Sequence, residues 1–200
     1  CAPGNGGIAE LAECVDIAAT DIENMVKFAK DNAIDLVMVA PDDPLVLGMV
    51  DAMEKEGIRA FGPRANAAII EGSKAFSKEL MKKYNIPTAN YEVFTDSTSA
   101  IDYIKAQNTF PTVIKADGLA LGKGVIIAQN LEEAEQAVHE MIDDGKFGKS
   151  GSRVVIEEFL TGPEVSVLAF TDGKSVKPMV SAQDHKRAYD NDEGLNTGGM

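Results

Sequence analysis

The sequence has no tryptophan and only two cysteines, Cys1 and Cys14, among its 200 residues. Zinc sites and disulfide frameworks need more cysteines than this, or pairs at closer spacing. An N-terminal cysteine serves as a nucleophile in some enzymes, but residues 2–5 (APGN) offer no base to activate Cys1. No Gly-x-Ser-x-Gly motif is present either, so the sequence disfavours covalent hydrolase chemistry.

Basic residues are also scarce, with 19 Lys and Arg against 32 Asp and Glu and a formal net charge of −13. Nucleic acids and anionic membranes are bound through clustered Lys and Arg side chains. We therefore expect neither as a partner. Small anionic substrates remain compatible with the sequence wherever a few cations gather in a local pocket, and nothing in the sequence predicts an oligomeric state.

Long apolar runs are missing too, since none approaches the ~18 residues of a membrane-spanning helix, and no signal peptide is recognisable. These absences predict a cytoplasmic protein. The apolar fraction of 44% and the charged fraction of 26% are ordinary for a globular chain. This length permits one large domain or two small ones with a real core.

The first ninety residues alternate between strand and helix patterns. A capping box at 20–23 (TDIE) precedes an apolar helical stripe, and 34–40 (IDLVMVA) is typical of a parallel strand buried on both faces. A helix over 45–55 and a short strand over 58–61 follow. The alternation predicts an α/β domain with a doubly wound parallel sheet, whose ligands bind at the carboxyl ends of the strands.

Beyond this region the pattern changes to antiparallel strands with helices. Ser73 is expected to cap a helix that runs to about Tyr84. The later segments include predicted strands at 91–95, 111–116, 125–128 and 153–159. One helix is expected to begin at Ser97 or Ser99 and run to about 107, and another, capped by Asn130 with Glu133 at N3, to run to about 143. A hairpin of 164–170 with 175–181 is expected to turn at Asp172-Gly173. We place a domain boundary near Tyr91, giving domains 1–91 and 92–200.

The stretch 111–128 (PTVIKADGLALGKGVIIA) carries a glycine-rich loop between two strands, with Lys115 and Lys123 at its mouth. Glycines allow consecutive backbone N–H groups to converge on one anion. The loop matches neither a Walker A motif nor a Rossmann fingerprint, because a strand follows it instead of a helix. This favours a phosphate-covering loop, although a glycine-rich hairpin with solvent-reaching lysines fits the same residues.

Two further groups of charged residues stand out. Glu157 and Glu158 end an apolar strand and Glu164 follows, and carboxylates there need hydrogen-bond donors such as an adenine amino group or ribose hydroxyls. The residues 184–187 (DHKR) place three basic side chains together in an acidic chain, suited to a phosphate or a carboxylate. A solvated acidic strand and a structural histidine are the plainer interpretations.

Five ordered motifs together resemble a known family. They are 62–63 (GP), 71–74 (EGSK), 113–124 (VIKADGLALGKG), 157–160 (EEFL) and 184–187 (DHKR). In this order they are similar to the phosphoribosylamine–glycine ligases, or glycinamide ribonucleotide synthetases, which belong to the ATP-grasp superfamily. The resemblance covers nearly the whole chain. It implies an incomplete doubly wound N-terminal domain followed by an α+β ATP-grasp domain, with 92–158 the small lid subdomain and 159–200 the start of the large one.

The resemblance also implies a set of ATP contacts. Lys74 and Lys115 would meet the phosphates, the loop would close over them, and the backbone of the 157–160 segment would hold adenine while Glu164 takes the ribose. The implied nucleotide-binding residues are Lys74, Lys115, Gly122, Lys123, Gly124, Glu157, Glu158, Phe159, Leu160 and Glu164. Arg187 and Asn196 match positions facing the phosphates, which with Lys115 makes them the implied catalytic residues. Asp184, His185, Lys186 and Gly198 are the implied substrate contacts.

By the same resemblance the reaction joins glycine to 5-phosphoribosylamine through glycyl phosphate, yielding glycinamide ribonucleotide, ADP and phosphate. The family's first strand would precede Cys1, and its Mg²⁺-binding Glu and Asn would follow Met200. The 200 residues are thus expected to hold no metal ligand and to be an inactive fragment. The alternatives are another ATP-grasp ligase or carboxylase, or a nucleotide-binding module without chemistry.

Overall fold

The computed structural model describes residues 1–120, 124–183 and 185–199. Its contacts divide the chain into two compact units, Cys1–Phe159 and Leu160–Met200, and each is described by itself. Across these described residues, no helix is both long and apolar enough to cross a membrane.

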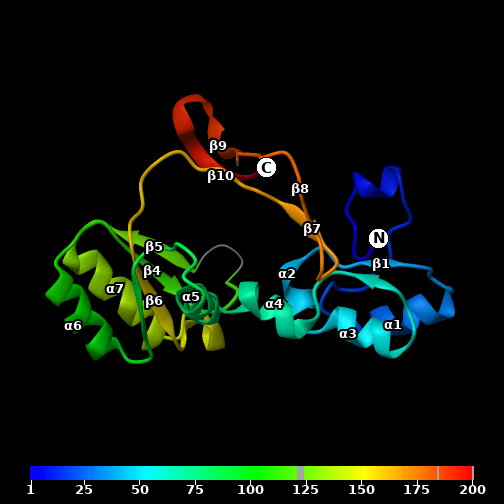
Figure 1. The fold of residues 1–200 in the computed structure, drawn as a ribbon, viewed down its shortest axis with the longest axis horizontal. Coiled ribbons are helices and arrows are strands. Elements are labelled where there is room, and N and C mark those ends of the chain that lie inside the picture. The colour runs from blue at the N-terminus through cyan, green and yellow to red at the C-terminus, as the bar shows by residue number, and fades with distance from the viewer. Residues whose placement is uncertain (121–123, 184, 200) are drawn as a thin grey trace. The chain divides into compact units, whose positions relative to one another are not determined.

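The first unit begins with a short 3-10 turn, Ile8–Glu10, and continues with helix α1 (Ile22–Asp31), strand β1 (Val37–Met38), helices α2 (Asp42–Val46) and α3 (Met49–Lys55), and strand β2 (Ala60–Phe61) (Figure 1). β1 and β2 are parallel, with Val37 opposite Ala60. This confirms the predicted β-α-β alternation.

The prediction of a strand over 34–40 buried on both faces is wrong. Only Val37 and Met38 form the strand, and Met38 is 61% exposed. α1 and α3 cover one face of the pair, where the buried residues are Ala29, Val39, Met49, Val50 and Met53. Side chains that alternate onto the other face therefore remain accessible in the described structure.

Two local details of this region also differ from prediction. Asp21, not Thr20, is the N-cap of α1, because its carboxylate accepts a hydrogen bond from the backbone N–H of Asn24 at 3.2 Å. The helix expected over 45–55 is divided at Gly48, which has φ 88° and separates α2 from α3. A left-handed residue cannot continue an α-helix, and glycine adopts that conformation without a steric penalty.

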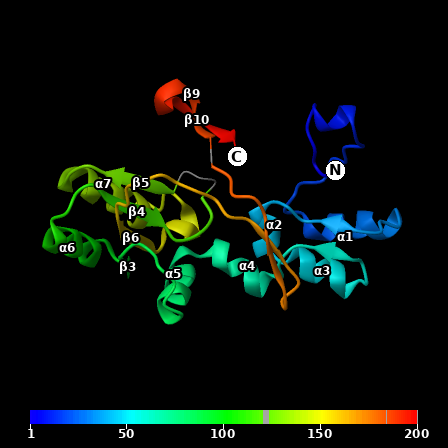
Figure 2. The same cartoon turned by 45° about the horizontal axis from the view of Figure 1, so that its top comes forward.

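A further pair of helices leads to the second sheet (Figure 2). α4 (Ala65–Gly72) was not predicted. α5 (Lys74–Lys83) confirms the prediction that Ser73 is its cap, since the Ser73 hydroxyl accepts from the N–H of Phe76 at 3.1 Å. Ser73 thus terminates α4 and starts α5.

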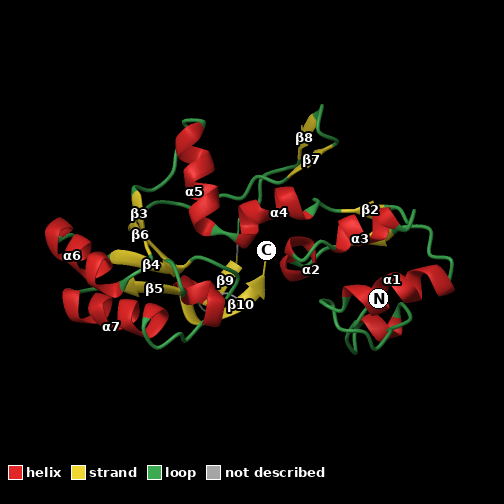
Figure 3. Ribbon diagram, turned by 90° about the horizontal axis from the view of Figure 1, so that it is seen from below, coloured by secondary structure: helices red, strands yellow, loops and turns green. Residues whose placement is uncertain are grey.

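The second sheet contains β3 (Tyr91–Phe94), β6 (Val154–Glu158), β4 (Thr112–Ala116) and β5 (Val125–Ala128), in that spatial order, and every neighbouring pair is antiparallel. Helices α6 (Ser97–Gln107) and α7 (Leu131–Ile142) lie together on one face (Figure 3). Asp96 and Asn130 cap them, each accepting from a backbone N–H three residues on. All of these elements match predicted segments, but the residue that caps α6 is Asp96 and not Ser97 or Ser99.

A second, larger core of the first unit lies between this sheet and its two helices. Alternate strand residues supply one side and the inner faces of α6 and α7 supply the other, with the members Ala100, Ile101, Ile104, Ile114, Ala116, Ala128, Ala134, Ala137, Val138, Met141, Val154 and Ile156. The opposite face of the sheet receives neither of these two helices, and we call it the open face. It is not bare, because Lys78 of α5 contacts Glu157 there and Val113 and Val155 are buried. The candidate site is found on this face.

The second unit, described by itself, contains two hairpins. β7 (Ala169–Thr171) and β8 (Val176–Pro178) are antiparallel and turn through Asp172-Gly173 as predicted, with the Asp172 carboxylate accepting from the N–H groups of Lys174 and Ser175. β9 (His185–Tyr189) and β10 (Glu193–Gly199) form a second pair through the 3-10 turn Asp190–Asp192. This second hairpin was not predicted, and it places the backbone of His185 on a strand.

Candidate functional site

The open face of the β3-β6-β4-β5 sheet follows from the strand register. Val113 pairs with Glu157 on β6 and Ile127 on β5, and Lys115 pairs with Val155 and Val125. Because side chains alternate along a strand, the residues on this face are those between the ones that point toward α6 and α7. They are Tyr91, Val93, Val113, Lys115, Val125, Ile127, Val155 and Glu157. Lys115 and Glu157 are the charged members of this set.

Glu157 is held between two lysines. The carboxylate is 6% exposed, and its Oε2 lies 2.9 Å from the Nζ of Lys115 and 3.2 Å from the Nζ of Lys78 on α5. The glutamate was predicted to need donors because it ends an apolar strand, and the structure supplies them as ammonium groups. One carboxylate against two cations leaves the group with a net positive charge.

Lys74, in the first turn of α5, lies near the same face. Its Nζ donates to the carbonyl of Gly118 at 3.0 Å. The pKa of Lys74 is lowered, chiefly because the side chain is partly buried, and the nearby charge of Lys115 also lowers it. The carboxylates of Asp117, Glu71 and Glu157 act in the opposite direction and raise it. Lys74 and Lys115 are the two lysines predicted to bind phosphate, and their joint action on one anion stays a prediction.

Asp117 fixes the start of α5 to the end of β4. Its buried carboxylate accepts from the hydroxyl of Ser73 at 3.0 Å and from the N–H of Ala75 at 2.7 Å. Nε of Arg153 also donates to it, at 2.9 Å. The N–H of Lys74 in turn donates to the Asp117 carbonyl at 3.0 Å. This clamp holds the Lys74 backbone next to the glycine-rich loop.

Two glycines of the loop are required by close packing. A Cβ on Gly118 would lie 2.5 Å from Ser150 Oγ, and one on Gly124 would lie 2.7 Å from the Cβ of Ala120 and 3.1 Å from that of Ala116. No side chain larger than hydrogen fits without a shift of the loop. Gly122 and Lys123 fall outside the described residues, so their predicted nucleotide contacts stay predictions.

The end of β6 carries the proposed adenosine segment. Glu158 accepts from both the backbone N–H and the side-chain amide of Asn90, and its own N–H donates to the Asn90 carbonyl at 3.0 Å. Phe159 and Leu160 follow as exposed residues at the junction of the two units. The Glu157 carbonyl likewise accepts from the Thr112 hydroxyl, so the printed backbone contacts of this segment are within the protein, and the predicted adenine contacts stay predictions.

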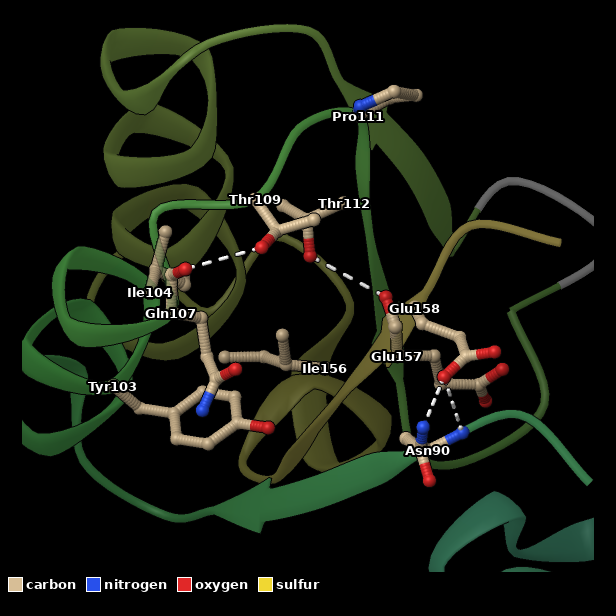
Figure 4. A pocket seen from close by; sticks show the side chains of 10 residues that line it. All are labelled: Asn90, Tyr103, Ile104, Gln107, Thr109, Pro111, Thr112, Ile156, Glu157 and Glu158. Atoms are coloured by element: carbon tan, nitrogen blue, oxygen red, sulfur yellow. Dashed lines mark hydrogen bonds between the residues drawn. The ribbon is translucent and has the colours of Figure 1, made fainter.

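A pocket of about 200 Å³ adjoins this segment, lined by Asn90, Tyr103, Ile104, Gln107, Thr109, Pro111, Thr112, Ile156, Glu157 and Glu158 (Figure 4). The Thr112 hydroxyl donates to the Glu157 carbonyl at 3.3 Å. Ile104 and Ile156 belong to the helix-facing core, so this pocket opens on the helix side of the sheet and contains neither Lys74 nor Lys115. The lysine-bearing open face, not this pocket, is therefore the candidate site.

In the second unit the backbone register pairs Arg187 with Asn196, and the predicted catalytic roles of these two residues stay predictions. Nη1 of Arg187 donates to the Gly194 carbonyl at 2.7 Å, and His185 pairs with Gly199. Glu164 is exposed. Lys186 lies on β9 and Gly198 on β10, while Asp184 lies outside the described residues.

Sequence reasoning missed Lys78, Asp117 and Arg153. Lys78 had a detectable signal, because it lies four residues after Lys74 and shares the buried face of α5 with Ala75. Asp117 follows Lys115 within the conspicuous loop motif but was not assigned a partner. Arg153 starts a strand far along the chain, and only the fold brings it to Asp117.

Comparisons with known proteins agree with this architecture. Residues 1–71 match the family model described as the N domain of phosphoribosylglycinamide synthetase, and residues 72–200 match that of its ATP-grasp (A) domain. The fold is thus of the ATP-grasp class with its preceding N domain. The chain belongs to the phosphoribosylglycinamide synthetase family. The domain boundary predicted near Tyr91 stays a prediction.

Individual relatives carry the same description. The chain is 54% identical over 199 residues to a phosphoribosylamine–glycine ligase of Halalkalibacterium halodurans, and 54% over 201 residues to that of Haemophilus influenzae. All of this chain is covered, against 46% and 47% of those relatives, so it spans about half their length. The crystal structure of the Thermotoga maritima phosphoribosylamine–glycine ligase matches with a TM-score of 0.77 and 34% identity, covering 99% of this chain and 47% of that one.

Proposed function

We propose that the protein to which this chain belongs is an ATP-dependent ligase that joins glycine to 5-phosphoribosylamine. The observation that carries the proposal is the placement of Lys74 and Lys115 beside a close-packed glycine loop on the open face of the sheet, in a chain of this family. The products would be glycinamide ribonucleotide, ADP and phosphate. The enzyme would act in the cytoplasm.

ATP would lie on the open face. The ammonium groups of Lys74 and Lys115 would neutralise its phosphates, with the loop from Gly118 to Gly124 over them. The backbone at Glu157, Glu158, Phe159 and Leu160 would receive adenine, and Glu164 would receive the ribose hydroxyls. The lysines support this placement, because they supply cations where the phosphates would be.

The protein's part in the reaction is positioning and charge neutralisation. The glycine carboxylate would attack the γ-phosphate to give glycyl phosphate, and the amine of phosphoribosylamine would then displace phosphate from it. Arg187 and Asn196, opposite each other on β9 and β10, would stabilise the transferring group together with Lys115. Asp184, His185, Lys186 and Gly198 would contact the substrates.

Mg²⁺ would supply additional neutralisation of the phosphate oxygens. In the described part of the chain, no three His, Cys, Asp or Glu side chains gather as a metal site. The lysines and the glycine loop are compatible with a metal-bound nucleotide, since ammonium and backbone N–H groups would bind phosphate oxygens and would not compete for the oxygen ligands of the metal.

The test is ADP release by the full-length enzyme supplied with ATP, Mg²⁺, glycine and phosphoribosylamine. We expect release only when glycine and phosphoribosylamine are both present. Turnover without them, or with bicarbonate alone, would instead indicate another ATP-grasp ligase or carboxylase. ATP binding without turnover under any condition would indicate a nucleotide-binding module.

A further inference from the structure

The Lys78–Glu157–Lys115 cluster contains one carboxylate and two ammonium groups that meet on the same oxygen. Both Nζ atoms contact Oε2 of Glu157, at 3.2 Å from Lys78 and 2.9 Å from Lys115. The two lysines reach it from different elements, α5 and β4. The two lysines differ in exposure and in their other contacts, and these differences indicate the role of each.

Lys78 is a fixed cation. Its side chain is 8% exposed, and its Nζ also donates to the Thr88 hydroxyl at 2.7 Å and lies 3.4 Å from the Ala89 carbonyl. The same Nζ lies 5.5 Å from the centroid of the Tyr91 ring, within cation–π range. With these partners in place, Lys78 has neither the exposure nor the freedom to reach a ligand.

Lys115 is the accessible member of the pair. Its side chain is 27% exposed on the open face, compared with 6% for Glu157. A strand lysine of this kind can turn toward an incoming phosphate. To do so it must leave Glu157, and a buried carboxylate without a counter-ion is costly.

We propose that Lys78 is a positioning residue that keeps Glu157 neutralised and thereby releases Lys115 to bind the phosphates of the nucleotide. With Lys78 present, Glu157 retains a permanent partner when Lys115 moves, and the cluster keeps a net positive charge toward the ligand. Without Lys78, Lys115 becomes the one remaining cation paired with Glu157 among the described residues, and Glu157 competes with the phosphates for it. This inference rests on the proposed nucleotide site and adds to it the residue that makes Lys115 available.

The experiment measures MgATP binding to the full-length enzyme by titration calorimetry for the wild type and four variants. We expect Lys78→Met to weaken MgATP binding at least about tenfold. In this variant the buried Glu157 carboxylate depends on Lys115 for its charge and therefore competes with the phosphates for that lysine. Lys78→Arg, which keeps the charge, should recover most of the loss. Lys82→Met is the matched control, an exposed lysine on the same helix, and should bind as the wild type does.

The decisive variant is the double substitution Lys78→Met with Glu157→Gln. Removing the carboxylate removes the competitor, so binding should return to within about threefold of the wild type. A purely structural or direct-contact role of Lys78 predicts no such rescue, and failure of the rescue would overturn the proposal. Equal binding by Lys78→Met and wild type would overturn it too.

If Lys78→Met does not fold, the comparison is made in the Glu157→Gln background. There the presence or absence of Lys78 should change MgATP binding by less than about threefold, and a larger change contradicts the proposal. If the wild type itself does not bind MgATP, the proposed nucleotide site fails, which is a different outcome from equal binding by wild type and variant.

Discussion

Lys115 on β4 and Glu157 on β6 are diagonal neighbours on the open face of the sheet, and their Nζ and Oε2 atoms lie 2.9 Å apart. Diagonal positions on an antiparallel pair are within reach of long side chains. The contact places a cation of the proposed phosphate site against a buried anion of the proposed adenosine segment.

The first prediction concerns Lys115 itself. Replacing it by alanine should weaken ATP binding roughly 10- to 100-fold, the loss expected for a hydrogen bond to a charged group. Folding should survive, because Lys78 still neutralises Glu157. Titration calorimetry on the full-length enzyme measures the effect. Lys55→Ala, an exposed lysine on α3, is the control, and an equal loss in both variants would contradict a specific role for Lys115.

The second prediction concerns the clamp at Asp117. Asp117→Asn should lower the free energy of unfolding by about 3 kcal/mol, because it leaves the Arg153 guanidinium facing a neutral amide and weakens the cap on α5. Urea unfolding of the full-length protein measures it. Asp102→Asn on the exposed side of α6 should change stability by less than about 0.5 kcal/mol. Similar effects of the two substitutions would show that the clamp is not stabilising.

The third prediction concerns the loop. Gly124→Ala places a methyl group 2.7 Å from the Cβ of Ala120, and neither neighbour has a flexible end that can move away. We expect a loss of about 1–3 kcal/mol in stability from overpacking and weaker ATP binding from the displaced loop. Gly6→Ala, which meets nothing within 4 Å, should be neutral in both assays. Unchanged ATP affinity in Gly124→Ala would argue that the loop does not touch the nucleotide.

The fourth prediction concerns pH. Because burial holds the pKa of Lys74 below its ordinary value of 10.5, its charge is complete below that lowered pKa and is lost as pH rises through it. The contribution of Lys74 to ATP affinity should therefore decline with rising pH before an ordinary lysine would titrate. In Lys74→Arg, whose guanidinium stays charged, the decline should be smaller. The measurement is the ATP affinity of the wild type and of Lys74→Arg across alkaline pH. The same pH dependence in both proteins would contradict this prediction.

Much of the second sheet was predictable from sequence because its signals are local. Asn130 with Glu133, Ser73 at a helix start and Asp172-Gly173 at a turn each act within a few residues, and the structure places all of them as expected. The loop between β4 and β5 was recognisable for the same reason. Its glycines and Lys115 stand in one continuous motif.

The features that could not be predicted depend on contacts between residues far apart in the chain. The apolar run at 34–40 has the composition of a fully covered strand, but burial requires a covering layer on both faces, and composition does not reveal whether one is present. Likewise, nothing near Lys78 indicates that it meets Glu157. The division of the expected helix at Gly48 was missed because an isolated glycine inside a helical pattern is often tolerated.

The central claim is that Lys74 and Lys115 meet the phosphates of ATP on the open face of the sheet. Amine-reactive labelling of the full-length enzyme, read by mass spectrometry with and without MgATP, tests it most directly. We predict that MgATP lowers the labelling of Lys74 and Lys115 while the exposed Lys55 and Lys82 label equally in both conditions. Equal labelling of Lys74 and Lys115 with and without saturating MgATP would contradict the claim.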